Sequence, residues 1–352
     1  MLDEAKQIRP GEGLDQNALS AYLAIQLGNT FTIREIRQFP GGYSNLTYLL
    51  VTSHGDFVLR RPPFGADIKS AHDMGREYRV LSLLHPVFGR VPRPVCYCED
   101  PAVLGAPFYL MERVQGVILR NRIPEDIVLS PALMRELSTS AIDNLAALHR
   151  LDIYATGLAA LGKPEGYVGR QVSGWIGRYY KAETDTIPGM DELARWMPEN
   201  QPDDGAPALI HNDYKYDNLV LDPDDLAQIR AVLDWEMCTV GDPLMDLGVT
   251  LAYWLEGYEA NLLSASVGNL TWLPGNLSRQ ELALRYAATT GRQMDHLLFY
   301  YIFGIFKIGA IVQQIYARYK KGFTQDPRFA PLIEVVRIFG QRGCHALEKG
   351  QI

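Results

Sequence analysis

The segment LIHNDYKYDNLVL, residues 209–221, encloses several polar side chains between two short apolar runs. Apolar runs of this length are typical of buried strands. A polar loop between buried strands costs free energy unless its groups are used, because each desolvated group must find a partner. The alternative is an ordinary turn, in which Asp and Asn side chains only cap the backbone.

The spacing of three of these side chains indicates a reaction. His211, Asp213 and Asn218 follow the pattern H-x-D-x-x-x-x-N, and a second carboxylate, Asp234, stands in the apolar run VLDWE. In phosphoryl transfer, one carboxylate accepts the proton of the attacking hydroxyl. An amide oxygen and a second carboxylate hold Mg²⁺ against the nucleotide phosphates. Mg²⁺ prefers such hard oxygen ligands. The pattern therefore favours phosphoryl transfer from a nucleotide.

A nucleotide must also be held, and the segment PGGYSN between two predicted strands is the first candidate. Gly41 and Gly42 let the backbone approach phosphates closely, with Ser44 and Asn45 beside them. A plain turn is the alternative, because two glycines between strands usually form only a turn.

The strand after this segment supplies a cation. Arg60 lies two residues after Val58, so both side chains point to the same face of the strand. We expect Val58 to contact a base and Arg60 to reach phosphates. Glu77 falls on the apolar stripe of a predicted helix, where it can pair with Arg60. The alternative for Glu77 is an ion pair on the helix surface.

Hydrophobic periodicity divides the chain into a strand-rich and a helix-rich part. The first part contains predicted helices at 14–28 and 67–84 and predicted strands at 31–39, 46–52, 56–61 and 106–116. Strands 46–52 and 56–61 form a predicted hairpin. The second part contains a predicted helix at 131–152, a hairpin at 219–233, and helices at 241–258, 278–289, 293–319 and 328–347.

Composition limits the classes of protein that fit. The chain has 352 residues, 47% of them hydrophobic and 21% charged, which suits a soluble protein of two lobes. The net charge of −7 argues against a nucleic-acid partner. The apolar run 296–316 contains Lys307 and is short for a membrane span, so a buried core helix is the better interpretation. Four cysteines without metal-site spacing indicate reduced thiols and a cytoplasmic location. We expect a monomer or homodimer.

The sequence resembles the aminoglycoside phosphotransferase (kinase-like) family from about residue 30 to residue 345. HNDYKYDN resembles the catalytic loop of that family, VLDWE its metal-binding strand, and GDPLMDL the start of the next helix. The segments FPGGYSNLTY and FVLRRPP most resemble a subgroup of the family that also occurs fused to acyl-CoA dehydrogenase domains.

The resemblance implies an α+β, bilobal protein-kinase-like fold. Residues 1–112 would form an N-terminal nucleotide-binding lobe, a small antiparallel sheet with one main helix. Residues 113–115 would be the hinge, and residues 116–352 a larger, mostly helical lobe that carries the catalytic and acceptor-binding residues.

The resemblance also implies roles for single residues. Asp213 would be the catalytic base, and Asn218 and Asp234 would bind Mg²⁺. His211 and Asp246 would support the catalytic loop.

The backbone around Met111, Glu112 and Val114 would meet the adenine of ATP. In this family a lysine usually stands where this chain has Arg60. Arginine is forked and always charged and can also hold phosphate, so Arg60 keeps the role. Its neighbour Arg61 shares a face with predicted core residues. Trp235 and Glu236 follow Asp234, so the Asp-Phe-Gly switch of protein kinases is absent from the sequence.

We therefore expect an ATP- and Mg²⁺-dependent kinase of a small-molecule hydroxyl. The alternatives are a nucleotide-binding module without catalysis, a metal-dependent hydrolase and an aminoglycoside-type antibiotic kinase. The segment 315–342 has six basic and two acidic side chains, which favours an anionic acceptor such as a hydroxyacyl-CoA-like molecule. A solvated helix face is the alternative.

Overall fold

A computed structural model describes most of the chain as two compact units. The described residues are 4–40, 45–64, 73–121, 123, 127–259, 263, 269–324 and 326–352. Unit 1 comprises Met1–Val117, Val220–Asp224 and Arg230–Glu236, and unit 2 comprises Ile118–Leu219, Asp225–Ile229 and Met237–Ile352. Unit 1 thus extends past the predicted lobe boundary and includes two later segments of the chain.

Backbone hydrogen bonds explain why these later segments belong to unit 1. Val117 and Leu221 exchange two backbone hydrogen bonds of 2.9 and 2.8 Å, and the Val232 N–H donates to the Arg90 carbonyl at 2.8 Å. Pattern analysis along the chain cannot show such long-range pairing, because each segment is too short to indicate its partner.

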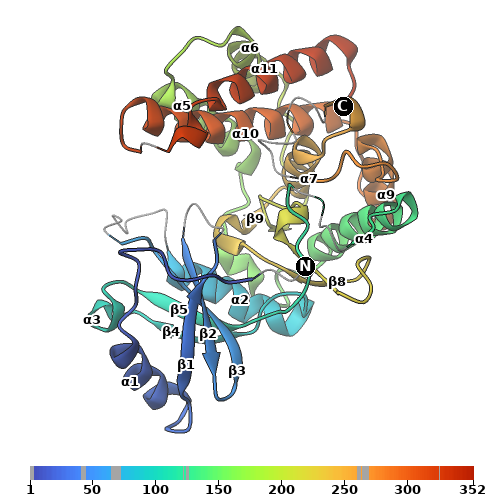
Figure 1. Cartoon of the computed structure of the whole chain (residues 1–352). Coiled ribbons are helices and arrows are strands. Elements are labelled where there is room, and N and C mark those ends of the chain that lie inside the picture. The colour runs from blue at the N-terminus through green and yellow to red at the C-terminus, as the bar shows by residue number, and fades with distance from the viewer. Residues whose placement is uncertain are drawn as a thin grey trace. The chain divides into compact units, whose positions relative to one another are not determined.

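Unit 1 is built on a five-stranded antiparallel sheet in the order β1-β2-β3-β5-β4 (Figure 1). Its strands are β1 (Ile33–Gln38), β2 (Leu46–Thr52), β3 (Gly55–Arg61), β4 (Pro94–Cys98) and β5 (Phe108–Glu112). The predicted hairpin of β2 and β3 is confirmed. The edge strand β4 was not predicted, because its two cysteines and leading proline give no clear strand pattern.

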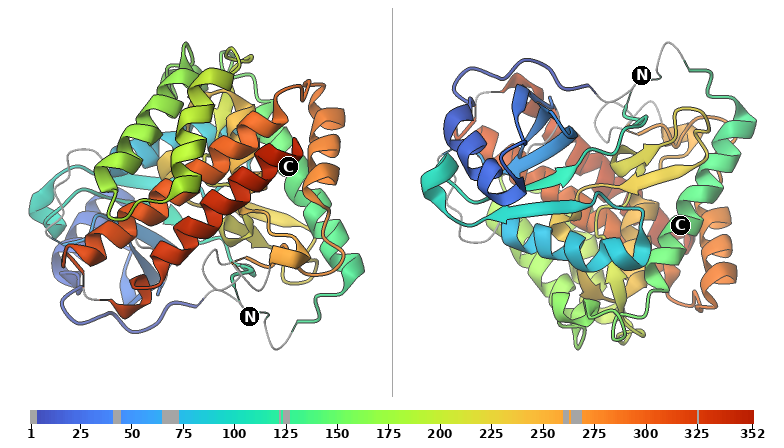
Figure 2. Two further views of the ribbon diagram at one scale, coloured as in Figure 1. Left: turned by 90° about the horizontal axis from the view of Figure 1, so that it is seen from above. Right: turned by 90° about the horizontal axis from the view of Figure 1, so that it is seen from below.

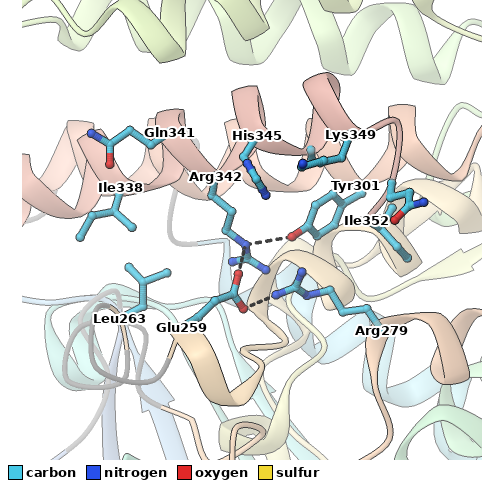
Figure 3. A pocket seen from close by; sticks show the side chains of 12 residues that line it. Glu259, Leu263, Arg279, Tyr301, Ile338, Gln341, Arg342, His345, Lys349 and Ile352 are labelled. Atoms are coloured by element: carbon cyan, nitrogen blue, oxygen red, sulfur yellow. Dashed lines mark hydrogen bonds and ion pairs between the residues drawn. The ribbon is translucent and has the colours of Figure 1, made fainter.

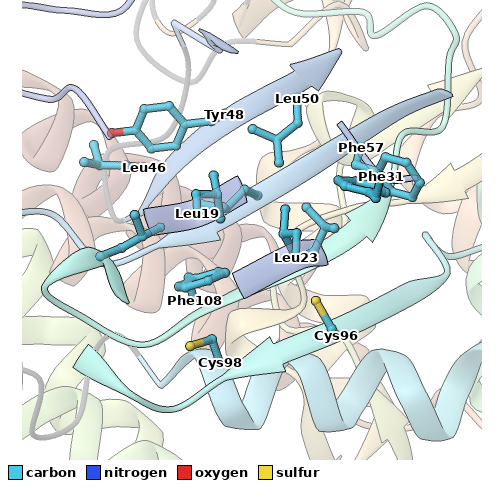
Figure 4. Close-up of a cluster of buried hydrophobic side chains, with 13 residues drawn as sticks. Leu19, Leu23, Phe31, Leu46, Tyr48, Leu50, Phe57, Cys96, Cys98 and Phe108 are labelled. Carbon is cyan, nitrogen blue, oxygen red and sulfur yellow. The ribbon is translucent and has the colours of Figure 1, made fainter. Parts of the chain in front are cut away.

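Two main helices cover this sheet. Helix α1 (Gln16–Leu27) begins at Asp15, whose carboxylate accepts from two helix N–H groups, and ends at Gly28. Its Leu19 and Leu23 lie in a buried cluster with side chains of β2, β3, β4 and β5 (Figure 4). Helix α2 (Met74–Phe88) packs against β4 and β5. The short helix α3 (Pro101–Leu104) contacts α1.

Alternation along β3 decides which side chains face each helix. Phe57 and Leu59 belong to the cluster that α1 covers, and Arg61 has the same parity. Val58 and Arg60 therefore point to the opposite face. Arg60 contacts Glu77 of α2 there.

Unit 2 is mostly helical, as predicted, and the α+β class is confirmed. Its longer helices are α4 (Pro131–His149), α5 (Tyr167–Ala182), α6 (Pro188–Asn200), α7 (Pro243–Tyr253), α9 (Arg279–Thr290), α10 (Leu297–Lys320) and α11 (Leu332–Lys349). Helices α5 and α6 were missed, because three glycines inside α5 and two prolines in α6 resemble loop signals.

Helix α10 is the centre of unit 2 and packs against α5, α6, α7 and α11 (Figure 2). Among the described residues it is the one helix long and apolar enough to cross a membrane. Within unit 2, however, 72% of its most apolar window is buried. It therefore packs as the core helix of this unit.

The apolar flanks of the loop at 211–218 belong to two different sheets. β6 (Ala208–Ile210) pairs with β9 (Thr239–Gly241), and β7 (Leu219–Leu221) pairs with β8 (Ile229–Val232). The predicted hairpin at 219–233 is thus confirmed. The segment VLDWE, expected to be a strand, is not strand throughout, since β8 ends at Val232 and a 3-10 turn, η3 (Trp235–Met237), follows.

Helices α7 and α10 cross at two glycines. A Cβ on Gly248 would lie 2.1 Å from the Tyr300 carbonyl oxygen, and one on Gly304 would lie 2.3 Å from the Gly248 oxygen. Neither contact is physically possible, so both positions need a hydrogen in place of a side chain. This close crossing fixes α7, which carries Asp246.

We expect Gly248→Ala to destabilise the chain by about 3 kcal/mol, because the α7–α10 backbones must separate to admit a methyl group. The matched control is Gly177→Ala in the exposed part of α5, where no atom lies within 4 Å of the added Cβ. The control should stabilise the chain by about 0.5–1 kcal/mol through helix propensity. Urea unfolding measures both variants, and equal effects would show that the crossing tolerates a methyl group.

Candidate functional site

Arg60 is the centre of a cluster of carboxylates in unit 1. Its guanidinium lies 3.1 Å from Glu77, 3.3 Å from Asp234 and 3.8 Å from Glu236. The Arg60 side chain is 12% exposed and that of Glu77 is 3% exposed. The predicted Arg60–Glu77 pair is therefore present and buried, and Asp234 lies beside it.

The charges in this cluster do not balance. One guanidinium faces three carboxyl groups, which leaves an excess of negative charge if all are ionised. Burial opposes the charge on Arg60, but Glu77 and the other acids raise its pKa above the usual value. Burial also raises the pKa of Glu77, against the effect of Arg60. A divalent cation near Asp234 would offset the excess negative charge.

Arg61 has a different environment from Arg60. Its side chain is 2% exposed, donates to the carbonyls of Pro62 and Leu104 at 3.1 Å, and lies 3.7 Å from the Phe64 ring centre. These contacts are structural, as the alternation along β3 predicted. Arg60 is thus the arginine that reaches the carboxylates.

The other predicted nucleotide residues lie in several places. Gly41, Gly42 and Ser44 are outside the described residues. Asn45 is buried, and its amide donates to Glu236 at 3.0 Å. Val58 is also buried, on the same face of β3 as Arg60.

The predicted hinge overlaps the end of a strand. Met111 and Glu112 are the last residues of β5 and pair with Val58 and Phe57 of β3, whereas Val114 follows the strand. The Glu112 carboxylate forms an ion pair with Arg93. Strand β5 therefore ends at Glu112, and the next residue, Arg113, still donates its backbone N–H to the Asp56 carbonyl at 3.2 Å.

The loop at 211–218 is held by one buried carboxylate in unit 2. Asp246 of α7 accepts from the backbone N–H of His211 at 2.6 Å and of Asn212 at 2.7 Å. The His149 ring contacts the same carboxylate at 3.1 Å. Burial alone would raise the pKa of Asp246, but the hydrogen bond from His149 and the backbone donors lower it overall. Asp246 therefore supports the loop, as the resemblance implied.

Backbone conformation singles out two positions. Asn212 and Asp234 are the non-glycine residues with positive φ among the described residues, at 69° and 66°. Such conformations cost free energy and persist where surrounding contacts enforce them, often at functional sites. One of the two directly precedes Asp213, and the other is the predicted metal ligand.

Asp213 is a half-buried carboxylate, 16% exposed, with several donors around it. The Lys215 ammonium lies 3.0 Å away, and the Asn218 amide donates to the Asp213 carboxylate at 3.0 Å and to its carbonyl at 2.8 Å. Burial would raise the pKa of Asp213, but Lys215, His211 and Tyr253 lower it below 3.8. Asp213 is therefore ionised at neutral pH, as a proton acceptor must be.

Asn218 is oriented in a way that suits a metal ligand. Because its amide nitrogen donates to Asp213, its amide oxygen is directed elsewhere. Its neighbour Asp217 has a buried oxygen without a hydrogen-bond partner among the described residues, and burial raises the pKa of Asp217 to about 7. A nearby cation would interact favourably with both the Asn218 amide oxygen and the Asp217 carboxylate. The donor set of carboxylate and amide oxygens therefore fits Mg²⁺.

The described side chains do not form a metal site whose ligands all come from the protein. Among the described residues, no group of three or more His, Cys, Asp or Glu side chains is arranged to hold a metal ion. The carboxylates of unit 1 surround the Arg60 guanidinium and do not converge on one point. Mg²⁺ in kinases takes few protein ligands and completes its shell with water and phosphates, so this arrangement is compatible with it.

Several residues that the sequence did not indicate also belong to these groups. Lys215 and Tyr253 contact Asp213, Glu236 contacts Arg60, and His149 contacts Asp246. The position of Lys215, two residues after Asp213 in the loop, was a signal that could have been used. Tyr253 and His149 come from helices distant in sequence, where no local pattern indicates them.

Unit 2 also contains a pocket of about 360 Å³ near the C-terminal end of α11 (Figure 3). Glu259 lies between Arg279 and Arg342, and Tyr301 accepts a hydrogen bond from Arg342 at 2.9 Å. His345 and Lys349 of α11 add basic groups to the lining, and every basic group named here lies on a helix of unit 2.

Arg342 connects the pocket with the surroundings of Asp213. Its guanidinium donates to the Ala252 carbonyl at 2.8 Å, and the next residue is Tyr253, which contacts Asp213. Arg342 of the pocket lining and Asp213 thus both contact the C-terminal end of α7.

The comparison with protein families identifies the class. The model of the phosphotransferase enzyme family (APH) matches residues 35–277. The chain belongs to this phosphotransferase family, and the resemblance stated from the motifs is confirmed.

Relatives of the chain carry a further part. The chain is 35% identical over 346 residues to acyl-CoA dehydrogenase family member 11 of Gallus gallus, which covers 96% of this chain and 44% of that protein. It is 35% identical over 316 residues to acyl-CoA dehydrogenase family member 10 of Mus musculus, which covers 89% of this chain and 29% of that protein. The chain therefore spans less than half the length of these relatives.

Solved structures confirm the kinase-like fold. A candidate aminoglycoside phosphotransferase from Ralstonia eutropha JMP134 is 30% identical with a TM-score of 0.78, and the match covers 96% of this chain and 99% of that chain. Choline kinase from Cryptosporidium parvum Iowa II has a TM-score of 0.65 at 11% identity, with 96% and 97% covered. The second likeness concerns the fold alone.

We expect Asp246→Asn to destabilise unit 2 by about 1–3 kcal/mol. Either amide orientation places an NH₂ group against a backbone N–H, because both carboxylate oxygens accept from the backbone. The pKa of Asp246 is lowered in the fold, so its contribution is complete above 3.8 and is lost as pH falls through the folded value.

Urea unfolding from about pH 5 to pH 8 should therefore show a constant difference between wild type and Asp246→Asn. The exposed Asp295→Asn is the control and should change stability by less than about 0.5 kcal/mol. A difference that grows toward acid pH would contradict the assigned direction.

Proposed function

We propose that the chain is an ATP- and Mg²⁺-dependent phosphotransferase that acts on a hydroxyl group of a small molecule. The observation that carries the proposal is the state of Asp213. It is a half-buried carboxylate, ionised at neutral pH, in a loop that Asp246 holds by two backbone N–H groups. Membership of the phosphotransferase family supports the reaction class.

In this proposal the phosphoryl group passes directly from ATP to the acceptor hydroxyl. The acceptor hydroxyl oxygen forms a bond to the γ-phosphorus, and the bond from that phosphorus to the β–γ bridging oxygen breaks. The hydroxyl proton passes to Asp213, and ADP leaves with the bridging oxygen. Lys215, 3.0 Å from Asp213, orients the carboxylate.

Asn218 and Asp234 would hold Mg²⁺, which supplies positive charge to the phosphates when bound. Arg60 is ion-paired in a buried position and would contact phosphate as the forked counterpart of the usual lysine.

Two competing functions predict different products. A nucleotide-binding module without catalysis would bind ATP and transfer nothing, and a metal-dependent hydrolase would release free phosphate. The presence of Asp213, Asn218 and Asp234 together speaks against a module that has lost catalysis, because transfer uses all three, one as the base and two as metal ligands.

We expect Asp213→Asn to lower kcat by about 10²–10⁴-fold, because the general base is removed, and to leave ATP binding nearly unchanged. Single-turnover transfer and calorimetric titration with Mg·ATP measure the two effects. The control is Asp295→Asn on the surface of unit 2, which should keep full activity. Retention of more than about a tenth of the wild-type rate would remove Asp213 from its role as the base.

The acceptor proposal is an anionic hydroxyacyl-CoA-like molecule. Most basic side chains of the segment 315–342 already have acidic partners, so their number alone carries little weight. The pairs are Lys320 with Asp185, Arg328 with Asp326, Arg337 with Glu334 and Arg342 with Glu259. The support comes from the pocket of Figure 3, whose lining includes His345 and Lys349 and whose Arg342 contacts the residue before Tyr253.

The relatives named acyl-CoA dehydrogenase family members support an acyl-CoA-like acceptor, since a fused enzyme often acts on a related molecule. We expect phosphorylation of hydroxyacyl-CoA thioesters, with a KM that rises with salt, and none of kanamycin. Lys349→Ala should raise the thioester KM, whereas Lys6→Ala in unit 1 serves as the control. Phosphorylation of kanamycin alone would overturn the acceptor while the phosphotransferase assignment stands.

A further inference from the structure

Lys307 occupies an unusual place in the core of unit 2. It lies in the middle of the apolar helix α10 and is 2% exposed. Its ammonium donates to the Asn212 carbonyl at 2.9 Å and to the Asn212 side-chain oxygen at 3.2 Å. It also lies 5.7 Å from the centre of the Trp175 ring of α5. Burying an ammonium costs free energy unless its N–H groups have acceptors. The two Asn212 oxygens are such acceptors, and the presence of a lysine at this buried position needs a functional explanation.

The Asn212 carbonyl belongs to the peptide group that leads into Asp213. On the other side of this peptide group, the Asp213 N–H donates to the His211 ring at 3.2 Å. Asn212 has a φ of 69°, and its own N–H donates to Asp246 at 2.7 Å. The peptide that precedes Asp213 is therefore held at its carbonyl by Lys307 and at its N–H by His211.

We propose that Lys307 is a positioning residue for phosphoryl transfer, which fixes the direction of the Asp213 carboxylate by holding the Asn212 carbonyl. The inference rests on the proposed function of Asp213 as the base. Lys307 does not touch the substrate, since its ammonium is directed to the Asn212 oxygens inside unit 2.

The strained conformation of Asn212 explains why the hydrogen bond from Lys307 to the Asn212 carbonyl matters. A non-glycine residue in the left-handed region relaxes unless its surroundings prevent it. Asp246 holds the N–H of this residue and Lys307 holds the carbonyl, so both ends of the strained residue are fixed by side chains of opposite charge. Without the ammonium, the carbonyl loses its donor and the peptide can rotate. A small displacement of a catalytic group is enough to slow a reaction considerably.

The charge of Lys307 depends on groups from several elements. Burial lowers the pKa of Lys307 to about 8, Asp246 and Asp213 raise it, and Arg178 of α5 and Lys215 of the loop lower it. The contact therefore weakens as pH rises through about 8, because a neutral amine donates more weakly than an ammonium.

The test compares Lys307→Met with Gln313→Met. Gln313 lies six residues later in α10, is fully buried, and donates to Ala182 and Thr184, away from the loop. Both variants replace a buried polar side chain of the same helix by an apolar one. We expect Lys307→Met to lower kcat by about 10- to 100-fold with little change in the ATP KM. Gln313→Met should keep kcat within about twofold.

The pH profile distinguishes positioning from a general loss of stability. Wild-type kcat should fall as pH rises through about 8, and this limb should be absent in Lys307→Met. Lys307→Arg, which keeps the charge, should retain more activity than Lys307→Gln, and these two variants serve if the Met variant does not fold. Equal kcat in Lys307→Met and Gln313→Met, or a loss confined to KM, would overturn the inference.

Hydrogen exchange tests the contact without any reaction. Exchange in residues 209–221 should be faster in Lys307→Met than in Gln313→Met, while exchange in β2 and β3 stays the same. If no acceptor is ever phosphorylated but this difference is seen, the proposed function fails and the structural contact stands. If transfer occurs and exchange at 209–221 is unchanged, the role of Lys307 fails alone.

Discussion

The contact between the Asp246 carboxylate and two consecutive backbone N–H groups, those of His211 and Asn212, is the constraint on which the loop of unit 2 depends. It holds Asn212 in a strained conformation and so decides where the next residue points. The close glycine crossing of α7 and α10 serves the same contact, because it fixes the helix that carries Asp246. The position of the loop at 211–218 thus depends on the Asp246 carboxylate, whose position depends in turn on the packing of α7 against α10.

In unit 1 the main electrostatic feature is an excess of negative charge around Arg60. It buries one arginine among three carboxyl groups, an arrangement that is short of positive charge. An excess of this kind is tolerable near solvent or near a cation, and Asp234 is the most exposed member, at 34%. The cluster therefore has its open side at Asp234, where a metal with bound phosphates would supply the missing charge.

Local patterns predicted what depends on local sequence. The hairpin of β2 and β3, the side chains that alternate along it, and the pair of Arg60 with Glu77 follow from a period of two in the strand and an apolar stripe in the helix. Asp213 and Asn218 could also be predicted from local sequence, because both stand in one short loop motif with a fixed spacing. Tyr253, Lys307 and His149 could not be predicted in this way, because they come from three separate helices: Tyr253 and Lys307 contact the loop, and His149 contacts Asp246. Glycines and prolines inside α5 and α6 concealed two helices that tertiary packing stabilises.

The division of the chain into units has a consequence for how the protein can be taken apart. The segment Arg230–Glu236, with Asp234 and Glu236, belongs to unit 1 although unit 2 precedes and follows it in sequence. A fragment that stops at Val117 would keep Arg60 and Glu77 and lose the other two carboxylates. Because each unit consists of several separate segments of the chain, no single cut yields either unit intact.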